Sequence, residues 1–187
     1  MCGRYFIADE ALEGYDIEAL NRATANGVSD FQPGMEAPVI VADCEGVERM
    51  HWGFSREQGG LVINARVETM EEKPMFRGLV DGQRCAVPAS GYYEWRRADK
   101  QKYAVDMRDS GRIWLAGLYR VGSRGKEFVV VTQPPLQAIQ PIHNRMPLIL
   151  PDKAAVDRWL RGDIPLFEDN GALRIAAEGP EQLQMTF

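Results

Sequence analysis

The chain has 187 residues, of which 45% are apolar and 26% charged, a composition typical of one soluble globular domain. Its formal net charge of −5 argues against indiscriminate binding to nucleic acid, although basic residues gathered on one face would still form a local groove. No segment approaches the roughly 18 apolar residues of a membrane span, and the N-terminus lacks the pattern of a signal peptide, so we expect a cytoplasmic protein.

Short strands dominate the predicted secondary structure. Nine segments rich in β-branched or aromatic residues, separated by Gly, Pro or Asp, are predicted to be strands: Tyr5–Ile7, Val39–Val41, Val47–Trp52, Leu61–Ile63, Arg84–Val87, Tyr92–Trp95, Tyr103–Met107, Ile113–Tyr119 and Phe128–Thr132. Asp109-Ser110-Gly111 and Gly122–Gly125 each lie between two of these segments, and we predict a hairpin turn at both.

Helices are predicted to be fewer than strands. Apolar residues recur at approximately helical spacing from Asp9 to about Arg22. A short helix is predicted after Pro134-Pro135, and a longer one opens at Pro151-Asp152 and ends at Gly162. Strands packed on one another with a few peripheral helices predict an α+β fold, a β-rich single domain of mostly antiparallel sheets or a barrel.

The cysteines and histidines form no metal-binding pattern. Cys2, Cys44 and Cys85 have no paired spacing, so a disulfide framework is not expected. Structural zinc takes clustered ligands, whereas His51 and His143 are far apart and no C-x-x-C motif is present. We therefore predict neither a metal nor another cofactor.

Cys2 draws attention through its position in the chain. Removal of Met1, which a small second residue normally permits, would leave an N-terminal cysteine with a thiol pKa of about 8.5 and an α-amine pKa of about 7.7–8.0. Such a 1,2-aminothiol reacts with an aldehyde, because the amine forms a Schiff base onto which the thiol closes to give a thiazolidine. A buried, inert thiol is the alternative, and Cys2 taken alone favours it.

Two further residues are candidates for proton transfer. His143 lies between Pro141 and Pro147 in a predicted rigid loop, and a histidine hydrogen-bonded within a turn is the alternative. Glu94 lies in an aromatic strand, on the same face as Tyr92. An apolar pocket would raise the pKa of Glu94 and suit it to acid–base catalysis, whereas an exposed strand glutamate fits the segment equally well.

Several residues are candidates for contact with a ligand. Asn64 and Arg66 follow a predicted strand, where polar groups are well placed to meet a ligand, and the forked donors of Arg66 suit phosphate; helix initiation is an alternative compatible with this. Trp52 offers a stacking surface for a base, although core packing is the more common role. Pro33 and Met75 are candidate apolar wedges between bases, although either is ordinarily filler.

A local basic groove would require distant residues to converge on one face. The sequence does not show that they do. The candidates are Arg4, Arg49, Arg66, Arg77, Arg84, Arg96, Arg97, Lys100, Lys102 and Arg145.

Five blocks of the chain, in this order, resemble the SOS-response-associated peptidase (SRAP) family of abasic-site processing proteins. They are Met1-Cys2-Gly3-Arg4, Trp52-Gly53, Asn64-Ala65-Arg66-Val67-Glu68-Thr69, Gly91-Tyr92-Tyr93-Glu94-Trp95 and His143-Asn144-Arg145-Met146-Pro147. The match runs from residue 1 to about residue 160. It implies a protein that binds single-stranded DNA and captures abasic sites as a covalent DNA–protein crosslink, within a β-rich α+β fold around a small closed barrel.

The resemblance also implies a role for each matching residue. Cys2 would be the crosslinking nucleophile through its amine and its sulfur. Glu94 would handle protons during ring opening and closure, His143 would be a second proton carrier, and Asn64 would hold the amine or the sugar. DNA contacts are expected from Arg4, Pro33, Trp52, Arg66, Met75 and Arg145.

The chain departs from the family pattern in three places: at Asn144, where an acidic residue often follows the histidine, in slightly irregular spacing after Pro33, and in a short divergent tail from about residue 166. We expect a single domain over residues 1–187 and a monomer. Two alternatives stay open: a cysteine peptidase or autopeptidase that uses Cys2, and a non-catalytic single-stranded DNA binding module.

Overall fold

The structure, a computed structural model, describes residues 2–8, 30–42, 46–108, 112–168 and 171–179. The helix predicted from Asp9 to about Arg22 lies outside these residues. All nine predicted strands are present, each overlapping a strand of the structure. The β-rich α+β fold class predicted from the sequence is confirmed.

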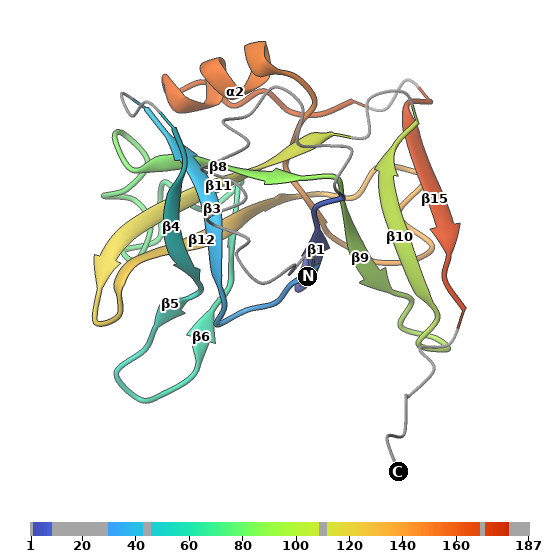
Figure 1. Ribbon diagram of the computed structural model, residues 1–187, viewed down its shortest axis with the longest axis horizontal. Helices are drawn as coiled ribbons and strands as arrows, with labels where there is room; N and C mark the ends of the chain where they lie inside the picture. The colour runs from blue at the N-terminus through green and yellow to red at the C-terminus, as the bar shows by residue number, and fades with distance from the viewer. Residues whose placement is uncertain (1, 9–29, 43–45, 109–111, 169–170, 180–187) are drawn as a thin grey trace.

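Five strands close into a barrel. Around the barrel they are β12 (Gly125–Gln133), β4 (Glu48–Trp52), β3 (Glu36–Val41), β8 (Arg84–Ala89) and β11 (Ile113–Gly122), and β11 pairs back with β12. Four of these five pairings are antiparallel, and only β4 with β12 is parallel. Because the circuit closes (Figure 1), the barrel strands satisfy one another's backbone groups on both sides. Their inward side chains form one core.

Shorter strands extend this sheet beyond the barrel. β7 (Asn64–Arg66) runs parallel to β12, and β13 (Met146–Pro147) pairs with the end of the same strand. β14 (Ile149–Leu150) pairs with β11. β5 (Phe54–Ser55) and β6 (Leu61–Val62) form a separate two-stranded hairpin.

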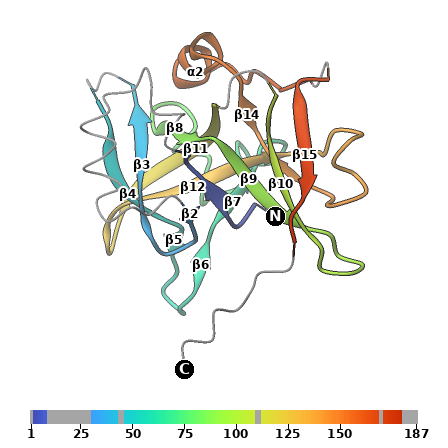
Figure 2. The ribbon, with the colours of Figure 1, turned by 45° about the vertical axis from the view of Figure 1, so that its right-hand side comes forward.

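A second sheet of five strands lies beside the barrel. Its order is β15 (Leu173–Ala177), β10 (Lys102–Met107), β9 (Gly91–Trp95), β1 (Tyr5–Phe6) and β2 (Asp30–Phe31). The N-terminal strand β1 lies between the barrel and β9 (Figures 1 and 2). The core side chains around β1 come from both layers, so the start of the chain is enclosed by the two sheets.

The helix α2 (Lys153–Leu160) packs on the barrel at β8. Asp152 caps its N-terminus by accepting a hydrogen bond from the Ala155 N–H at 2.7 Å, and Gly162 follows its C-terminus with a φ of 111°. The buried Trp159 donates its indole N–H to the Cys85 carbonyl at 2.9 Å. Among the residues that the structure describes, no helix is long and apolar enough to cross a bilayer.

Three predictions of local structure had different outcomes. The turn at Gly122–Gly125 is confirmed, because these two residues pair at the end of the β11–β12 hairpin. A hairpin across residues 109–111, which lie outside the described ranges, is wrong. Its two flanking strands belong to different sheets, since β9 and β15 already occupy both edges of β10.

The predicted short helix after Pro134-Pro135 is also wrong. Two successive turns stand in its place, closed by hydrogen bonds from the Ile139 N–H to the Leu136 carbonyl at 2.9 Å and from the Ile142 N–H to the Ile139 carbonyl at 2.8 Å. Pro141 has no N–H to donate, so a helical ladder cannot continue through it.

The predicted divergent tail contains a strand that sequence patterning missed. β15 pairs with β10 over five residues, Leu173 opposite Met107 through Ala177 opposite Tyr103. Only one of its residues, Leu173, is fully buried, so its sequence lacks the alternation that marks a strand packed on a core. Whether residues 1–187 form a single domain stays a prediction.

Candidate active site

Cys2 lies at the entrance to β1 and is fully buried. It belongs to the core cluster between the two sheets, together with Tyr5 and Tyr92. Burial raises the pKa of the Cys2 thiol well above its usual range, and the negative charge of Glu94 raises it further. The thiol therefore carries its proton at neutral pH.

Glu94 lies in an enclosed position and not on the exposed face of β9. It is 3% exposed, on the buried side of the strand with Tyr92, while Tyr93 and Trp95 are half-exposed on the other side. Burial raises the pKa of Glu94 to about 7. Both protonation states are therefore populated near neutral pH, as a proton-transfer group requires.

Strand pairing brings these two groups together. The Tyr93 N–H donates to the Arg4 carbonyl at 2.9 Å, and Tyr5 is paired with Tyr92, so residues before Arg4 run alongside Glu94. The Cys2 thiol and the Tyr92 hydroxyl both respond to the Glu94 charge, which places the three side chains in one electrostatic cluster.

Two phenol groups lie in the same cluster. The hydroxyls of Tyr5 and Tyr92 are buried and have no hydrogen-bond partner among the described residues. Both rings are fully buried, and burial raises the pKa of each hydroxyl, as does charge on Cys2. Strand alternation predicts that Tyr92 shares a face with Glu94, but neither tyrosine has a predicted role, because phenol oxygens near a thiol leave no local pattern in the sequence.

Asn64 opens β7 and presents an acceptor that the described residues do not use. Its amide Nδ2 donates to the Val130 carbonyl at 3.4 Å, but its Oδ1 is buried and has no hydrogen-bond partner among them. The parallel pairing of β7 with β12 sets Asn64 opposite Val130. A ligand amine or hydroxyl would satisfy this oxygen.

His143 follows the two turns and is 8% exposed. Its Nδ1 lies 3.1 Å from both the backbone N–H and the carbonyl oxygen of Arg145, so Nδ1 accepts from the N–H in one tautomer and donates to the carbonyl in the other. Burial lowers the pKa of His143, and the positive charge of Arg97 adds to the shift, so the ring is mostly neutral at pH 7. A neutral imidazole is able to take up a proton during a reaction.

Arg145 is used to hold this loop in place. Its guanidinium donates to both carboxylate oxygens of Glu68, at 2.9 Å for Nη2 with Oε2, and to the Thr132 carbonyl at 2.6 Å. Its side chain is 13% exposed. These contacts engage Nη1 and Nη2 within the protein, whereas the buried Nε has no hydrogen-bond partner among the described residues, and contact of Arg145 with DNA stays a prediction. Spacing in the sequence does not link Glu68 or Thr132 to residue 145.

The family follows from comparison with known proteins. A family model described as "SOS response associated peptidase (SRAP)" matches residues 1–185. The chain belongs to the SRAP family. The match extends through the tail that was expected to diverge from about residue 166.

The relatives of this SRAP chain that carry names are described as abasic site processing proteins. The chain is 30% identical over 180 residues to the abasic site processing protein YoqW of Bacillus subtilis, and this match covers 86% of the chain and 80% of YoqW. It is 34% identical over 124 residues to the abasic site processing protein YedK of Escherichia coli, covering 63% of this chain and 54% of YedK. A solved structure of a Bordetella bronchiseptica protein has the same fold, with a TM-score of 0.77 at 21% identity over 96% of this chain and 100% of that one.

Trp52 is not the stacking surface expected from the SRAP resemblance. It is 0% exposed, with its ring centroid 5.3 Å from that of Tyr5 and 6.1 Å from that of Phe128, and its indole N–H donates to the Ile63 carbonyl at 3.1 Å. A side chain enclosed in this way has no face open to a base. Trp52 instead joins the barrel to the strand that leads to Asn64.

The other expected DNA contacts remain accessible to different degrees. Arg66 is exposed and has no side-chain partner among the described residues. Arg4 pairs with Asp30 at 2.8 Å and is 22% exposed. Pro33 lies half-buried in a turn whose Gly34 N–H donates to the Trp52 carbonyl, and Met75 is 41% exposed.

Two of the basic residues that the sequence offered for a groove are engaged within the protein. Arg84 is buried, with its Nε donating to the Val80 carbonyl at 2.7 Å and its guanidinium 4.3 Å from the Trp159 ring centroid. Arg49 pairs with Glu36 at 2.9 Å.

Among the described residues, no group of three or more His, Cys, Asp or Glu side chains is arranged to hold a metal ion.

Proposed function

We propose that this SRAP protein captures abasic sites in single-stranded DNA by forming a thiazolidine crosslink through Cys2 once Met1 has been removed. The observation that carries the proposal is a buried Cys2 beside a buried Glu94 whose pKa is raised to about 7. The curated relatives are named abasic site processing proteins. A ring-opened abasic sugar presents an aldehyde at C1′, which is the electrophile that a 1,2-aminothiol traps.

The reaction proceeds in two bond-forming steps. The Cys2 amine attacks C1′, and loss of one water gives a Schiff base. The Cys2 sulfur then bonds to the same carbon, the electron pair of the C=N bond passes to nitrogen, and the thiol proton is transferred to that nitrogen. The product is a thiazolidine that contains all atoms of the protein and the DNA except one water.

Glu94 is positioned to carry the protons of both steps. Because the pKa of the Cys2 thiol is raised, the thiol needs a base when it closes onto the Schiff base. The carboxylate of Glu94 accepts that proton, and its protonated form, populated near a pKa of 7, donates to the departing water or the opening sugar ring. Neutral His143 provides a second acceptor.

The remaining site residues, Asn64, Arg66 and Arg4, would hold the DNA strand. The unpartnered Oδ1 of Asn64 accepts from the Cys2 amine or a sugar hydroxyl. Arg66 and Arg4 contact flanking phosphates, which supplies affinity without reading the base sequence.

Cysteine peptidase activity fits this geometry less well. A peptidase nucleophile works as a thiolate, which requires a lowered thiol pKa, whereas burial and Glu94 raise that of Cys2. In addition, the Nδ1 atom of His143 is engaged by the backbone of Arg145. A triad would have a carboxylate at this position.

The proposal is tested with Met1-processed protein and single-stranded DNA that contains one abasic site. We expect a heat-stable shifted band on a denaturing gel, with an intact mass equal to protein plus DNA minus one water. Undamaged DNA and the Cys2→Ala variant should give no such band. Cys2→Ser should bind DNA nearly as well as the wild type but form no stable adduct, and a heat-stable adduct from it would contradict the thiazolidine mechanism.

The same preparation separates the alternatives. Salt-sensitive DNA binding without an adduct, despite a confirmed N-terminal cysteine, would favour a non-catalytic binding module. Peptide hydrolysis that Cys2→Ala abolishes would favour the peptidase.

A further inference from the structure

The hydroxyl groups of Tyr5 and Tyr92 are buried polar atoms that take no part in the proton transfers of Glu94 and His143. Both tyrosines are 0% exposed. Neither hydroxyl forms a hydrogen bond with the Cys2 sulfur or with any other described residue. A phenylalanine would give the same ring packing without the cost of burying an unpaired hydroxyl, and buried polar groups in proteins normally have a partner. The two hydroxyls therefore indicate a bound group that supplies an acceptor.

The pairing of β1 with β9 sets both hydroxyls in the region of Cys2 and Glu94. Tyr5 lies directly opposite Tyr92, so the two side chains share one face of the sheet. Glu94 follows Tyr92 by two residues and lies on the same buried face. Cys2 belongs to the same core cluster as both rings. Burial raises the pKa of both hydroxyls and charge on Cys2 raises it further, which places them close to the thiol.

Aromatic packing holds the Tyr5 ring in place. Its centroid is 4.9 Å from that of Phe31, at an interplanar angle of 13°, and 5.3 Å from that of Trp52. Trp52 is itself fixed, because its indole N–H donates to the Ile63 carbonyl at 3.1 Å. The Tyr5 hydroxyl is therefore held at one point of the core, and a donor that is fixed in advance loses little entropy when an acceptor binds.

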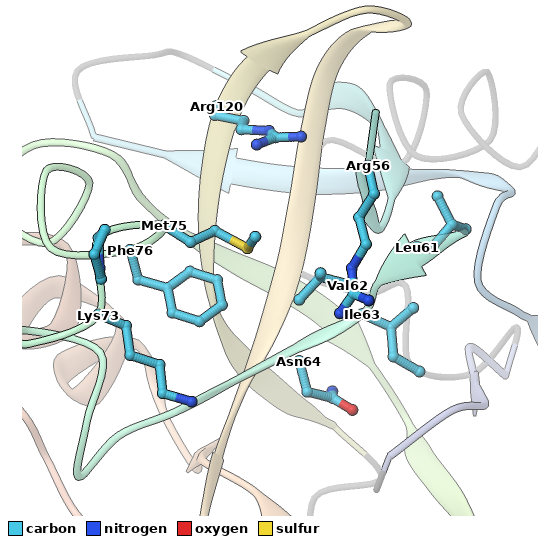
Figure 3. A pocket seen from close by; sticks show the side chains of 10 residues that line it. Arg56, Leu61, Val62, Ile63, Asn64, Lys73, Met75, Phe76 and Arg120 are labelled. Atoms are coloured by element: carbon cyan, nitrogen blue, oxygen red, sulfur yellow. The ribbon is translucent and has the colours of Figure 1, made fainter. Parts of the chain in front are cut away.

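The proposed capture site has an open side and a closed side. Ile63 and Asn64, which follow one another in the chain, line an open cavity of about 820 Å³ (Figure 3). Tyr5 and Tyr92 are fully buried and are not among the residues that line it. A carbon atom that enters past Asn64 and reaches Cys2 therefore meets the two phenols at the closed side. Their hydroxyls are available to a bound substrate and not to solvent.

The aldehyde oxygen is the atom of the substrate that most needs such donors. When the Cys2 amine attacks C1′, the electron pair of the C=O bond moves to oxygen, which gains negative charge. Asn64 offers an acceptor, its Oδ1, and Glu94 is a carboxylate in part of the molecules at neutral pH. The phenols keep their protons, because burial and charge on Cys2 raise the pKa of both hydroxyls. They are therefore donors throughout the reaction.

We propose that the hydroxyls of Tyr5 and Tyr92 donate hydrogen bonds to the aldehyde oxygen on C1′ and so accelerate the attack of the Cys2 amine. The two amine protons finally pass to that oxygen, which leaves as water, while both phenols keep their own protons. This inference rests on the proposed function, because the oxygen in question is that of the captured aldehyde. It assigns the two hydroxyls to the first bond-forming step and not to closure by sulfur.

The first experiment isolates that step in Met1-processed protein that carries Cys2→Ser, which keeps the N-terminal amine but has no thiol. Sodium cyanoborohydride reduces the Schiff base to a stable amine, so the band on a denaturing gel reports its formation on single-stranded abasic DNA. At saturating protein we expect Tyr5→Phe and Tyr92→Phe each to lower the rate about tenfold, and the double variant about 100-fold. The rate of thiazolidine formation should fall by the same factors in protein that retains Cys2.

Tyr119→Phe is the matched control. Tyr119 is half-buried and packs against the same core cluster, but its hydroxyl is not one of the buried unpartnered atoms. Its replacement should change either rate by no more than about twofold. If the Tyr5→Phe/Tyr92→Phe double variant matches this control in both assays, the inference is overturned and the capture function stands.

Two further outcomes separate the alternatives. Normal trapping of the Schiff base in the Cys2→Ser background, with slow thiazolidine formation when Cys2 is present, would assign the hydroxyls to the sulfur step and overturn the inference. If the wild type forms no adduct with abasic DNA, the proposed function itself fails.

Urea denaturation distinguishes a role in the reaction from a structural one. Removal of a hydroxyl that has no partner in the folded protein should leave the urea midpoint of each variant equal to that of the wild type or above it. A hydroxyl that stabilises the fold would lower the midpoint when removed. Slower trapping with an unchanged or higher midpoint supports the inference, whereas a lower midpoint with unchanged trapping would assign the hydroxyls to the fold alone.

Discussion

Individual residues of the site owe their chemistry to burial. The same carboxyl group on an exposed strand would titrate near 4.5, whereas in its enclosed position the pKa of Glu94 is about 7. Burial acts in the opposite direction on His143, whose pKa is lowered, because its charged form is the cation. At neutral pH both groups are therefore able to exchange protons.

The raised pKa of Glu94 predicts a pH-dependent cost in stability. Below the ordinary pKa of 4.5 both folded and unfolded states are protonated and no cost arises. As the pH rises from 4.5 toward 7, the Glu94 carboxyl loses its proton in the unfolded state but keeps it in the folded state. The free energy of unfolding therefore falls over this range. Between pH 4 and pH 8 the wild type should lose on the order of 3 kcal/mol relative to Glu94→Gln, measured by urea denaturation.

Glu94→Gln should also slow adduct formation about 100-fold and remove the inflection near pH 7 from the rate profile. Glu57→Gln, at an exposed position on the β5–β6 hairpin, is the matched control and should leave both profiles unchanged. An unaltered inflection in Glu94→Gln would assign the proton transfer to another group.

At the scale of secondary-structure elements, the reactive groups lie on turns and short strands and not on the long strands of the barrel. His143 is presented by the segment between β12 and β13, and this segment is attached through Arg145 to Glu68 and Thr132. The backbone of Arg145 contacts the His143 ring while its side chain contacts the neighbouring strand end. Arg145 is in this way a positioning residue for His143.

Arg145→Lys should loosen the loop, because an ammonium cannot reproduce the forked contact with Glu68. We expect a loss of about 1 kcal/mol in stability, kept small because Glu68 is 40% exposed. As the His143 ring gains solvent, its lowered pKa should rise toward the ordinary value.

Proton NMR is able to follow this change directly, because the chain has only two histidines and His51 serves as an internal reference. The exposed Arg77→Lys is the control, with no expected change in either titration. A His143 titration identical in Arg145→Lys and wild type would remove the positioning role.

At the scale of the whole molecule, the start of the chain is enclosed between two sheets. β1 pairs with β9 on one edge and with β2 on the other, and its Tyr5 side chain lies in the core. The burial of Cys2 therefore depends on the barrel and the second sheet together.

This arrangement predicts protection of two cysteines from alkylation. In the native protein, iodoacetamide should modify Cys2 and Cys85 much more slowly than in urea, since both thiols are fully buried and burial raises the pKa of each. Peptide mapping by mass spectrometry after timed exposure measures each site separately. If Cys2 reacts equally fast with and without urea while Cys85 stays protected, the enclosure of the N-terminus is wrong.

Much of the fold and of the site was accessible from the amino-acid sequence. Strand positions follow from local composition, so all nine predicted strands are present and Glu94 shares a face with Tyr92. Cys2, Asn64, Glu94 and His143 were selected from residue chemistry and from ordered motifs, both of which are local properties of the chain.

Other features depended on contacts between residues far apart in the sequence. Local patterns do not specify strand partners, which is why a hairpin was expected where the chain passes from one sheet to the other, and why β15 was missed. Burial also depends on the whole fold: it placed Trp52 in the core and enclosed Glu94, a question that the alternation of β9 left open. In the same way, the sequence does not show that Arg145 pairs with Glu68, because the partner of a charged group is set by three-dimensional proximity.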